Sequence, residues 1–166
     1  YYRIRAGTSQ FRHSNYHDEE SIIVLERVIN KLLSSGIRVI TYLTPLPPSV
    51  LSYMEKYPDK YKYIHEFRNE LSKISSNHFD FHDSMTANIT DCEFIDGFHG
   101  GDIISARILR EIMSGMDDLF RNTTNDNIID ELISNSSGLA SGMDSYSYIE
   151  GDRTEVDFLQ LGCQKI

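Results

Sequence analysis

An amphipathic helix that leads through a single glycine into a β-branched strand constrains the fold of this chain more than any other feature. Residues 18–35 carry apolar side chains at helical spacing, namely Ile22, Leu25, Ile29 and Leu32. Gly36 is typical of the left-handed residue that ends a helix. The strand predicted over residues 37–43 must end at Thr44, because the prolines that follow cannot continue a ladder of hydrogen bonds. This order is typical of the second half of a βαβ unit, so it predicts a parallel sheet.

The segments that follow continue the alternation of helices and strands. Two helices, a short strand, a long loop and a last helix are predicted in that order, over residues 49–57, 60–75, 78–83, 84–101 and 102–113. The fold class is therefore α/β with a mostly parallel sheet. After residue 118 the sequence becomes polar and rich in Ser and Gly, apart from a short apolar stretch over 128–133. We predict one α/β domain over residues 1–118 and a polar tail or appended segment over 119–166.

The acidic balance of the chain excludes two classes of partner. The 25 Asp and Glu residues outnumber the 16 Lys and Arg residues, which gives a net charge of −9. General binders of nucleic acid or of anionic membranes rely on clustered Lys and Arg, so neither partner is expected. No apolar stretch approaches the roughly 20 residues that span a bilayer, so no membrane-spanning helix is predicted. The tyrosines around Pro58 are expected to cover the core and not to stack on bases: Tyr53, Tyr57, Tyr61 and Tyr63.

Two cysteines and three glycosylation triplets leave the cellular compartment open. Cys92 and Cys163 match neither a metal-binding motif nor a disulfide framework. The Asn-x-Ser/Thr triplets begin at Asn88, Asn122 and Asn135, and in a chain rich in Ser and Asn such triplets also arise by chance. The redox environment of the chain is therefore not predicted.

The segment most suited to chemistry is the loop before the last predicted helix. It places Asp96 three residues before His99, among the glycines that let the loop bend, Gly97, Gly100 and Gly101. An imidazole that is oriented by a carboxylate can take the proton of a serine hydroxyl as the oxygen attacks an acyl carbon. The unperturbed pKa of histidine, about 6.5, suits this task. A helix-capping aspartate beside a surface histidine would give the same pattern.

In its context, this motif resembles the C-terminal half of the SGNH/GDSL hydrolase family. In that family a central strand often ends in a Pro-containing segment, and a late loop carries Asp-x-x-His before the last helix. The likeness covers residues 1–115, and Asp96-Gly97-Phe98-His99 is its most specific part. It implies that Asp96 is the triad aspartate, that His99 is the general base, and that the fold is a three-layer α/β/α flavodoxin-like sandwich.

The resemblance also implies a function. The parent protein would be a serine esterase or acyltransferase that acts on acyl esters, including those of carbohydrate or cell-envelope polymers. Its partner would be the acyl-ester substrate, and no cofactor is needed, because the triad and an oxyanion hole carry acyl transfer. Among family members the chain is most similar to the cell-envelope types, which favours an extracytoplasmic location. Nothing in the sequence indicates an oligomeric state.

The chain departs from the family in its first residues. The family's serine lies in a Gly-Asp-Ser-like motif, and no Gly-Asp-Ser occurs here. Gly7 stands where the oxyanion-hole glycine is expected, whereas Ser9 takes the place of the asparagine, for which Asn15 is a substitute. Residues 1–6 would then be the end of the strand that feeds this motif. Because the chain starts at Tyr1 without Met, we expect the fold to be incomplete at its N-terminus, its serine to lie upstream, and this chain alone to be inactive.

Two other interpretations remain open from the sequence. The chain could be a non-catalytic module with a degenerate SGNH fold that binds glycan or protein through its tyrosines and acidic side chains. The second is a metal site, because His78, Asp80 and His82 alternate along the predicted strand and so share one face. A metal there would need a further ligand, and a solvated face of an edge strand explains the same pattern. No metal ligand is therefore assigned.

Overall fold

The protein is described by a computed structural model over residues 1–14, 18–116, 120, 126–141 and 155–164. The chain forms two compact units. Unit 1 comprises residues 1–44 and 50–82, and unit 2 comprises residues 45–49 and 83–166. Within the described residues, no helix is long and apolar enough to cross a membrane.

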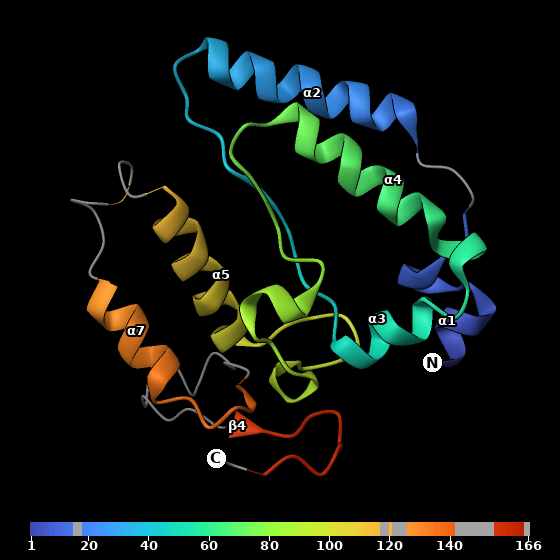
Figure 1. The fold of residues 1–166 in the computed structure, drawn as a ribbon, viewed down its shortest axis with the longest axis vertical. Helices are drawn as coiled ribbons and strands as arrows, with labels where there is room; N and C mark the ends of the chain where they lie inside the picture. The colour runs from blue at the N-terminus through green and yellow to red at the C-terminus, as the bar shows by residue number, and fades with distance from the viewer. Residues whose placement is uncertain (15–17, 117–119, 121–125, 142–154, 165–166) are drawn as a thin grey trace. The chain divides into compact units, whose positions relative to one another are not determined.

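Helices make up most of unit 1, and the longest is the helix that dominates the sequence pattern. Helix α2 spans Glu19–Ser34, as predicted, and Asp18 caps it by accepting the backbone N–H groups of Glu20 and Ser21. The short helix α3 (Pro48–Met54) precedes α4 (Pro58–Ile74), and these two confirm the predicted helices on either side of Pro58. Helices α2 and α4 lie along one another (Figure 1).

Unit 1 also contains a small parallel sheet. Strand β1 (Thr41–Leu43) pairs with β2 (His78–Asp80), and Tyr42 lies opposite Phe79. The predicted parallel pairing is therefore confirmed. The first strand is shorter than expected from its β-branched residues, because the partner strand is only three residues long and residues 37–40 have no strand opposite them. A run of β-branched residues predicts where a strand can form, but the length of the strand depends on the neighbouring strand with which it pairs.

The prediction of a strand over residues 1–6 is wrong. The structure has a helix there, α1 (Tyr2–Ala6), whose one buried side chain is Ile4. Gly7 ends this helix with a left-handed φ of 66°, as the C-terminal cap of a helix does. The segment is held by Tyr61 of α4, whose hydroxyl donates to the backbone oxygens of Ile4 (2.8 Å) and Phe11 (3.0 Å). Burial of this hydroxyl raises the pKa of Tyr61 to about 12.

Unit 2 is built around helix α5 (Asp102–Gly115), the last helix predicted from the sequence. Two short 3₁₀ turns precede it, η2 (Ser84–Ala87) and η3 (Asp91–Glu93). The buried face of α5 carries apolar residues at helical spacing, among them Ile104, Ile108 and Ile112. Helix α7 (Asp126–Ser134) lies beside α5 (Figure 1), and Arg110 of α5 pairs with Asp130 of α7 at 2.6 Å.

The part of the chain after residue 118 contributes ordered elements to unit 2. Besides α7, it forms an antiparallel pair of two-residue strands, β3 (Ala140–Ser141) and β4 (Glu155–Val156). Leu139 and Ala140 are 4% and 0% exposed, so this segment supplies core residues despite its polar composition. Polar composition alone does not show whether a short apolar stretch within a segment packs against a domain.

The fold is a mixture of helices and short strands, as expected for the α/β class. The described residues hold two separate two-stranded sheets, and not the larger parallel sheet of a flavodoxin-like sandwich.

Candidate functional site

The structure brings Asp96 and His99 together. Nδ1 of His99 lies 2.8 Å from Oδ2 of Asp96, a distance at which the ring N–H donates to the carboxylate. The bond uses Nδ1, so Nε2 is the ring nitrogen that remains for a proton transfer. The two side chains are 64% and 55% exposed, which leaves the imidazole accessible to an incoming group. The pair therefore has the local geometry of a general base and the carboxylate that orients it.

A short hairpin, which we call the site hairpin (residues 94–100), carries the pair. The backbone N–H of Ile95 donates to the oxygen of His99 at 2.9 Å, and Phe94 forms a β-bridge with Gly100. Phe94 is fully buried and anchors the hairpin to the core of unit 2. The burial of Phe94 thus fixes one strand of the hairpin, while the tip of the hairpin exposes Asp96 and His99 to solvent.

Asp96 organises the tip of the hairpin and does not cap the following helix. Its Oδ1 accepts the backbone N–H groups of Phe98 (2.7 Å) and His99 (2.6 Å). Helix α5 begins at Asp102 behind the N-cap residue Gly101, with no side-chain cap. The interpretation of Asp96 as the cap of α5 is therefore wrong, because its carboxylate bonds within its own loop.

These bonds keep Asp96 ionised. Partial burial by itself would raise the pKa of this carboxyl, but the hydrogen bond from the His99 ring and those from the backbone of His99 and Phe98 outweigh it. The pKa of Asp96 is consequently lower than its ordinary value. An ionised carboxylate on Nδ1 fixes the tautomer of the imidazole and stabilises its protonated form.

A buried ion pair beneath the hairpin was not found from the sequence. Glu93 is 1% exposed, and its Oε1 accepts from Nε and Nη2 of Arg107 at 3.2 and 3.0 Å. Its Oε2 accepts the backbone N–H of Thr90 at 2.8 Å, so both oxygens of the buried carboxylate have partners. The backbone oxygen of Glu93 also accepts the N–H of Gly101, which closes the base of the site hairpin. The sequence carries no local signal for this burial, because a charged residue in a loop is usually solvated.

The structure describes one of the two oxyanion-hole candidates. Gly7 lies in unit 1, where it ends α1, and a Cβ at this position would lie 2.5 Å from the His13 ring. Asp96 and His99 lie in unit 2. Asn15 lies outside the described residues.

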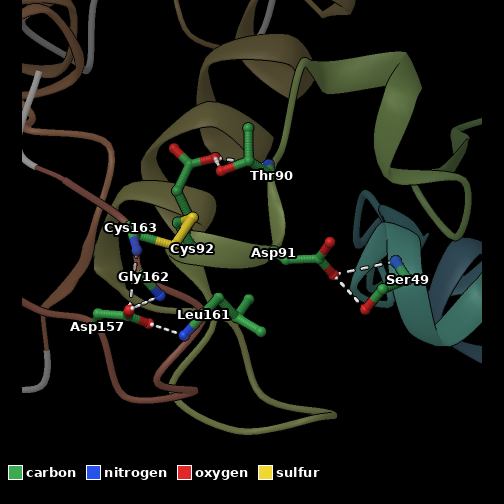
Figure 2. Close-up of a disulfide and its surroundings, with 9 residues drawn as sticks. Ser49, Thr90, Asp91, Cys92, Asp157, Leu161, Gly162 and Cys163 are labelled. Carbon is green, nitrogen blue, oxygen red and sulfur yellow. Dashed lines mark hydrogen bonds between the residues drawn. A yellow bond between two sulfur atoms is a disulfide. The ribbon is translucent and has the colours of Figure 1, made fainter.

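A disulfide joins the two cysteines for which the sequence indicated no partner. Cys92 of η3 is bonded to Cys163, and their Cα atoms are 6.0 Å apart (Figure 2). The expectation that these cysteines form no disulfide framework is therefore wrong. The signal was weak because 71 positions separate the two residues, and the fold brings them together. Of the glycosylation triplets, Asn88 and Asn135 are exposed, whereas Asn122 lies outside the described residues.

The polar face of β2 packs against α4, so its side chains are half-buried and not fully solvated. Arg68 of α4 donates to Asp80 at 2.6 Å, and Asp80 also accepts the backbone N–H of His82 at 3.0 Å. His78 is bonded through Nδ1 to Thr41 at 3.0 Å. In the part of the chain that the structure describes, no group of three or more His, Cys, Asp or Glu residues is arranged to hold a metal ion. The residues that suggested a metal site thus form a polar layer between helix and strand.

This polar layer predicts an acid-sensitive unit 1. Burial lowers the pKa of His82 below its ordinary value, and the nearby Arg68 and His65 add to this, against the opposing effects of Asp80 and the backbone of Thr44. The unfolded chain then binds the proton at a higher pH than the folded chain. The stability of unit 1 is therefore complete above about pH 6.5 and falls as the pH drops below it.

The measurement is the thermal midpoint by circular dichroism between pH 7.5 and 5. We expect the midpoint to fall by several degrees on acidification, and His82→Gln to reduce that fall. The matched control is His65→Gln, which replaces an exposed histidine of α4 whose effect on the pKa of His82 is smaller than those of burial and Arg68. An equal fall in both variants would contradict the assignment to His82.

Comparison with known proteins adds no relative. No family model, no curated protein and no solved structure matches the chain. The resemblance to SGNH hydrolases therefore rests on the residues named above.

Proposed function

We propose that this chain supplies the general base and its orienting carboxylate to an SGNH-like serine esterase or acyltransferase. The observation that carries the proposal is the bond between Nδ1 of His99 and the carboxylate of Asp96 in an accessible loop directly before α5. In the reaction, Nε2 of His99 takes the proton of a serine hydroxyl as the oxygen attacks the acyl carbon. The same nitrogen then returns the proton to the leaving alcohol, and Asp96 stabilises the imidazolium between the two steps.

The serine is proposed to come from sequence outside these 166 residues. The chain has no Gly-Asp-Ser, and His99 has no serine hydroxyl as a partner among the described residues. We use the name serine-bearing protein for this chain together with the sequence that supplies the nucleophile. Its complete fold is proposed to be the flavodoxin-like sandwich, in which further parallel strands would extend the β1–β2 pair.

The substrate class proposed is an acyl ester, including esters carried by carbohydrate or envelope polymers. The exposed position of the pair supports a large substrate, because no part of the site hairpin encloses the imidazole. The Cys92–Cys163 disulfide supports a location outside the reducing cytosol, where such bonds persist. No cofactor takes part in the proposed reaction.

The second candidate is a binding module with a degenerate SGNH fold. The observation that favours it is the absence of a Gly-Asp-Ser motif, together with exposed tyrosines, since Tyr1 and Tyr2 are 65% and 71% exposed. Aromatic side chains of this kind can stack on sugar rings or fill a protein interface. The two candidates differ in one respect that can be measured: only the enzyme has a reactive serine.

A fluorophosphonate probe, which reacts with activated serines, separates the candidates. We expect the probe to label the serine-bearing protein at one serine outside residues 1–166 and to leave the 166-residue chain unlabelled. Mass spectrometry of the labelled peptide locates the serine, and heat-denatured protein is the control for nonspecific reaction. The absence of any labelled serine in the serine-bearing protein would favour the binding module.

A further inference from the structure

The site hairpin is supported from one side by β3, which comes from a distant part of the sequence. A Cβ placed on Gly101, at the base of the hairpin, would lie 3.2 Å from Ala140 of β3. Next to this contact, the hydroxyl of Ser141 donates to the carboxylate of Asp102, the first residue of α5. Ser141 is buried, so this bond is shielded from water. Strand β3 therefore fixes the point at which the hairpin joins α5.

Strand β3 is held in turn by the C-terminal strap, which we define as residues 155–164. The strap begins with β4, the antiparallel partner of β3. It then turns around Asp157, whose carboxylate accepts the backbone N–H groups of Leu161 (3.1 Å), Gly162 (2.8 Å) and Cys163 (3.0 Å) (Figure 2). These bonds, the one from Leu161 first, hold the pKa of Asp157 below its ordinary value. The turn fixes the backbone of Cys163 for its bond to Cys92.

The disulfide closes this arrangement into a ring. Cys92 lies one residue before Glu93, whose backbone oxygen receives the N–H of Gly101. The ring therefore has four links. The site hairpin joins η3 to β3, β3 pairs with β4 of the strap, and the disulfide connects the strap back to η3. Two-residue strands are marginal by themselves, so the covalent bond is the strongest link between the strap and the rest of unit 2.

We propose that the Cys92–Cys163 disulfide is a redox control on the Asp96–His99 pair. In the oxidised chain the ring holds the base of the site hairpin, and the pair keeps its geometry. In the reduced chain the strap is released, β3 loses its partner, and the hairpin becomes mobile. Only the consequence for catalysis rests on the proposed function, since the structural coupling is a property of the chain itself.

The chemical step is thiol–disulfide exchange with a dithiol reductant. One thiolate of the reductant attacks one sulfur of the pair, which forms a mixed disulfide and releases the other cysteine as a thiolate that takes up a proton. The second thiolate of the reductant then displaces the remaining cysteine, so the reductant becomes a disulfide and the protein gains two electrons and two protons. Both cysteines are half-buried, which gives a small dithiol access to the bond.

Amide hydrogen exchange by NMR on the 166-residue chain tests the coupling, with and without dithiothreitol. The amides of Ile95 and Gly101 report on the site hairpin, because their partners are the backbone oxygens of His99 and Glu93. We expect reduction to speed their exchange at least about tenfold more than that of Ile108 of α5, which reports on the unfolding of the whole unit, while Leu71 of α4 in unit 1 changes by less than about threefold. The pKa of Asp96 should rise toward its ordinary value at the same time.

Two variants complete the test. The double variant Cys92→Ser with Cys163→Ser should reproduce the reduced chain without any reductant. Asp130→Asn, which removes the ion pair between α5 and α7 and leaves the ring intact, should not change the exchange of Ile95 or Gly101. Unchanged exchange of these two amides on reduction would overturn the proposal. An equal loss of protection throughout unit 2 would also overturn it, because the disulfide would then stabilise the whole unit and not control the hairpin.

Discussion

Replacing His99 with alanine is expected to lower kcat/KM of the serine-bearing protein for an aryl acetate by about 10³-fold. Without the imidazole, the serine hydroxyl keeps its proton, and at neutral pH it is a weak nucleophile. The loss should appear mainly in kcat, because His99 acts on the reacting atoms and does not hold the rest of the substrate. The measurement is steady-state hydrolysis of p-nitrophenyl acetate.

Asp96 and His65 provide the graded comparison for this experiment. Asp96→Asn keeps the shape of the side chain but removes the charge that stabilises the imidazolium, so a loss of at least about 10²-fold is expected. His65→Ala removes an exposed histidine of unit 1 and should leave turnover unchanged. Unaltered turnover in His99→Ala would show that this residue is not the general base.

Reduction of the Cys92–Cys163 disulfide is expected to lower the free energy of unfolding of unit 2 by about 4 kcal/mol. The bond joins residues 71 positions apart, and the entropy that a crosslink removes from the unfolded chain grows with the length of the closed loop. A loss of this size is a large fraction of the stability of an ordinary domain. The measurement is urea unfolding in the presence and absence of dithiothreitol.

The expected result has an internal check, because the chain has two cysteines. Protein prepared under oxidising conditions should show no free thiol in a thiol assay after denaturation, and reduced protein should show two per chain. The double variant Cys92→Ser with Cys163→Ser should unfold at the same urea concentration as the reduced chain. Two free thiols in the oxidised preparation, or a midpoint that reduction leaves unchanged, would contradict the account.

Local signals in the sequence predicted the helices well. Helix α2 has a capping residue, Asp18, an apolar stripe and a glycine stop, so every local preference agrees with the structure. For α5 the apolar stripe alone was sufficient, because its isoleucines recur at helical spacing although no side chain caps the helix. The Asp96–His99 pair was also predicted from the sequence. The two residues lie only three positions apart in one loop, so their side chains can meet without any contact between distant segments.

Apart from the parallel pairing of β1 with β2, features that depend on contacts between distant residues were missed. The disulfide and the β3–β4 pair join segments that local patterns describe as a polar tail. The strand expected over residues 1–6 came from the family resemblance, whereas Gly7 favours a helix that ends at that point. Glu93 was overlooked because a charged residue in a loop is usually solvated, and only its contact with Arg107 shows why this one is buried.

The most direct test of the central claim is fluorophosphonate labelling of the serine-bearing protein and of its His99→Ala variant, side by side. We predict rapid labelling at one serine outside residues 1–166, and labelling of the variant that is slower by about 10²-fold or more, because the imidazole at position 99 activates that serine. Equal rates in the two proteins, or a labelled serine within residues 1–166, would contradict the assignment of His99 as the base of a triad completed from outside this chain.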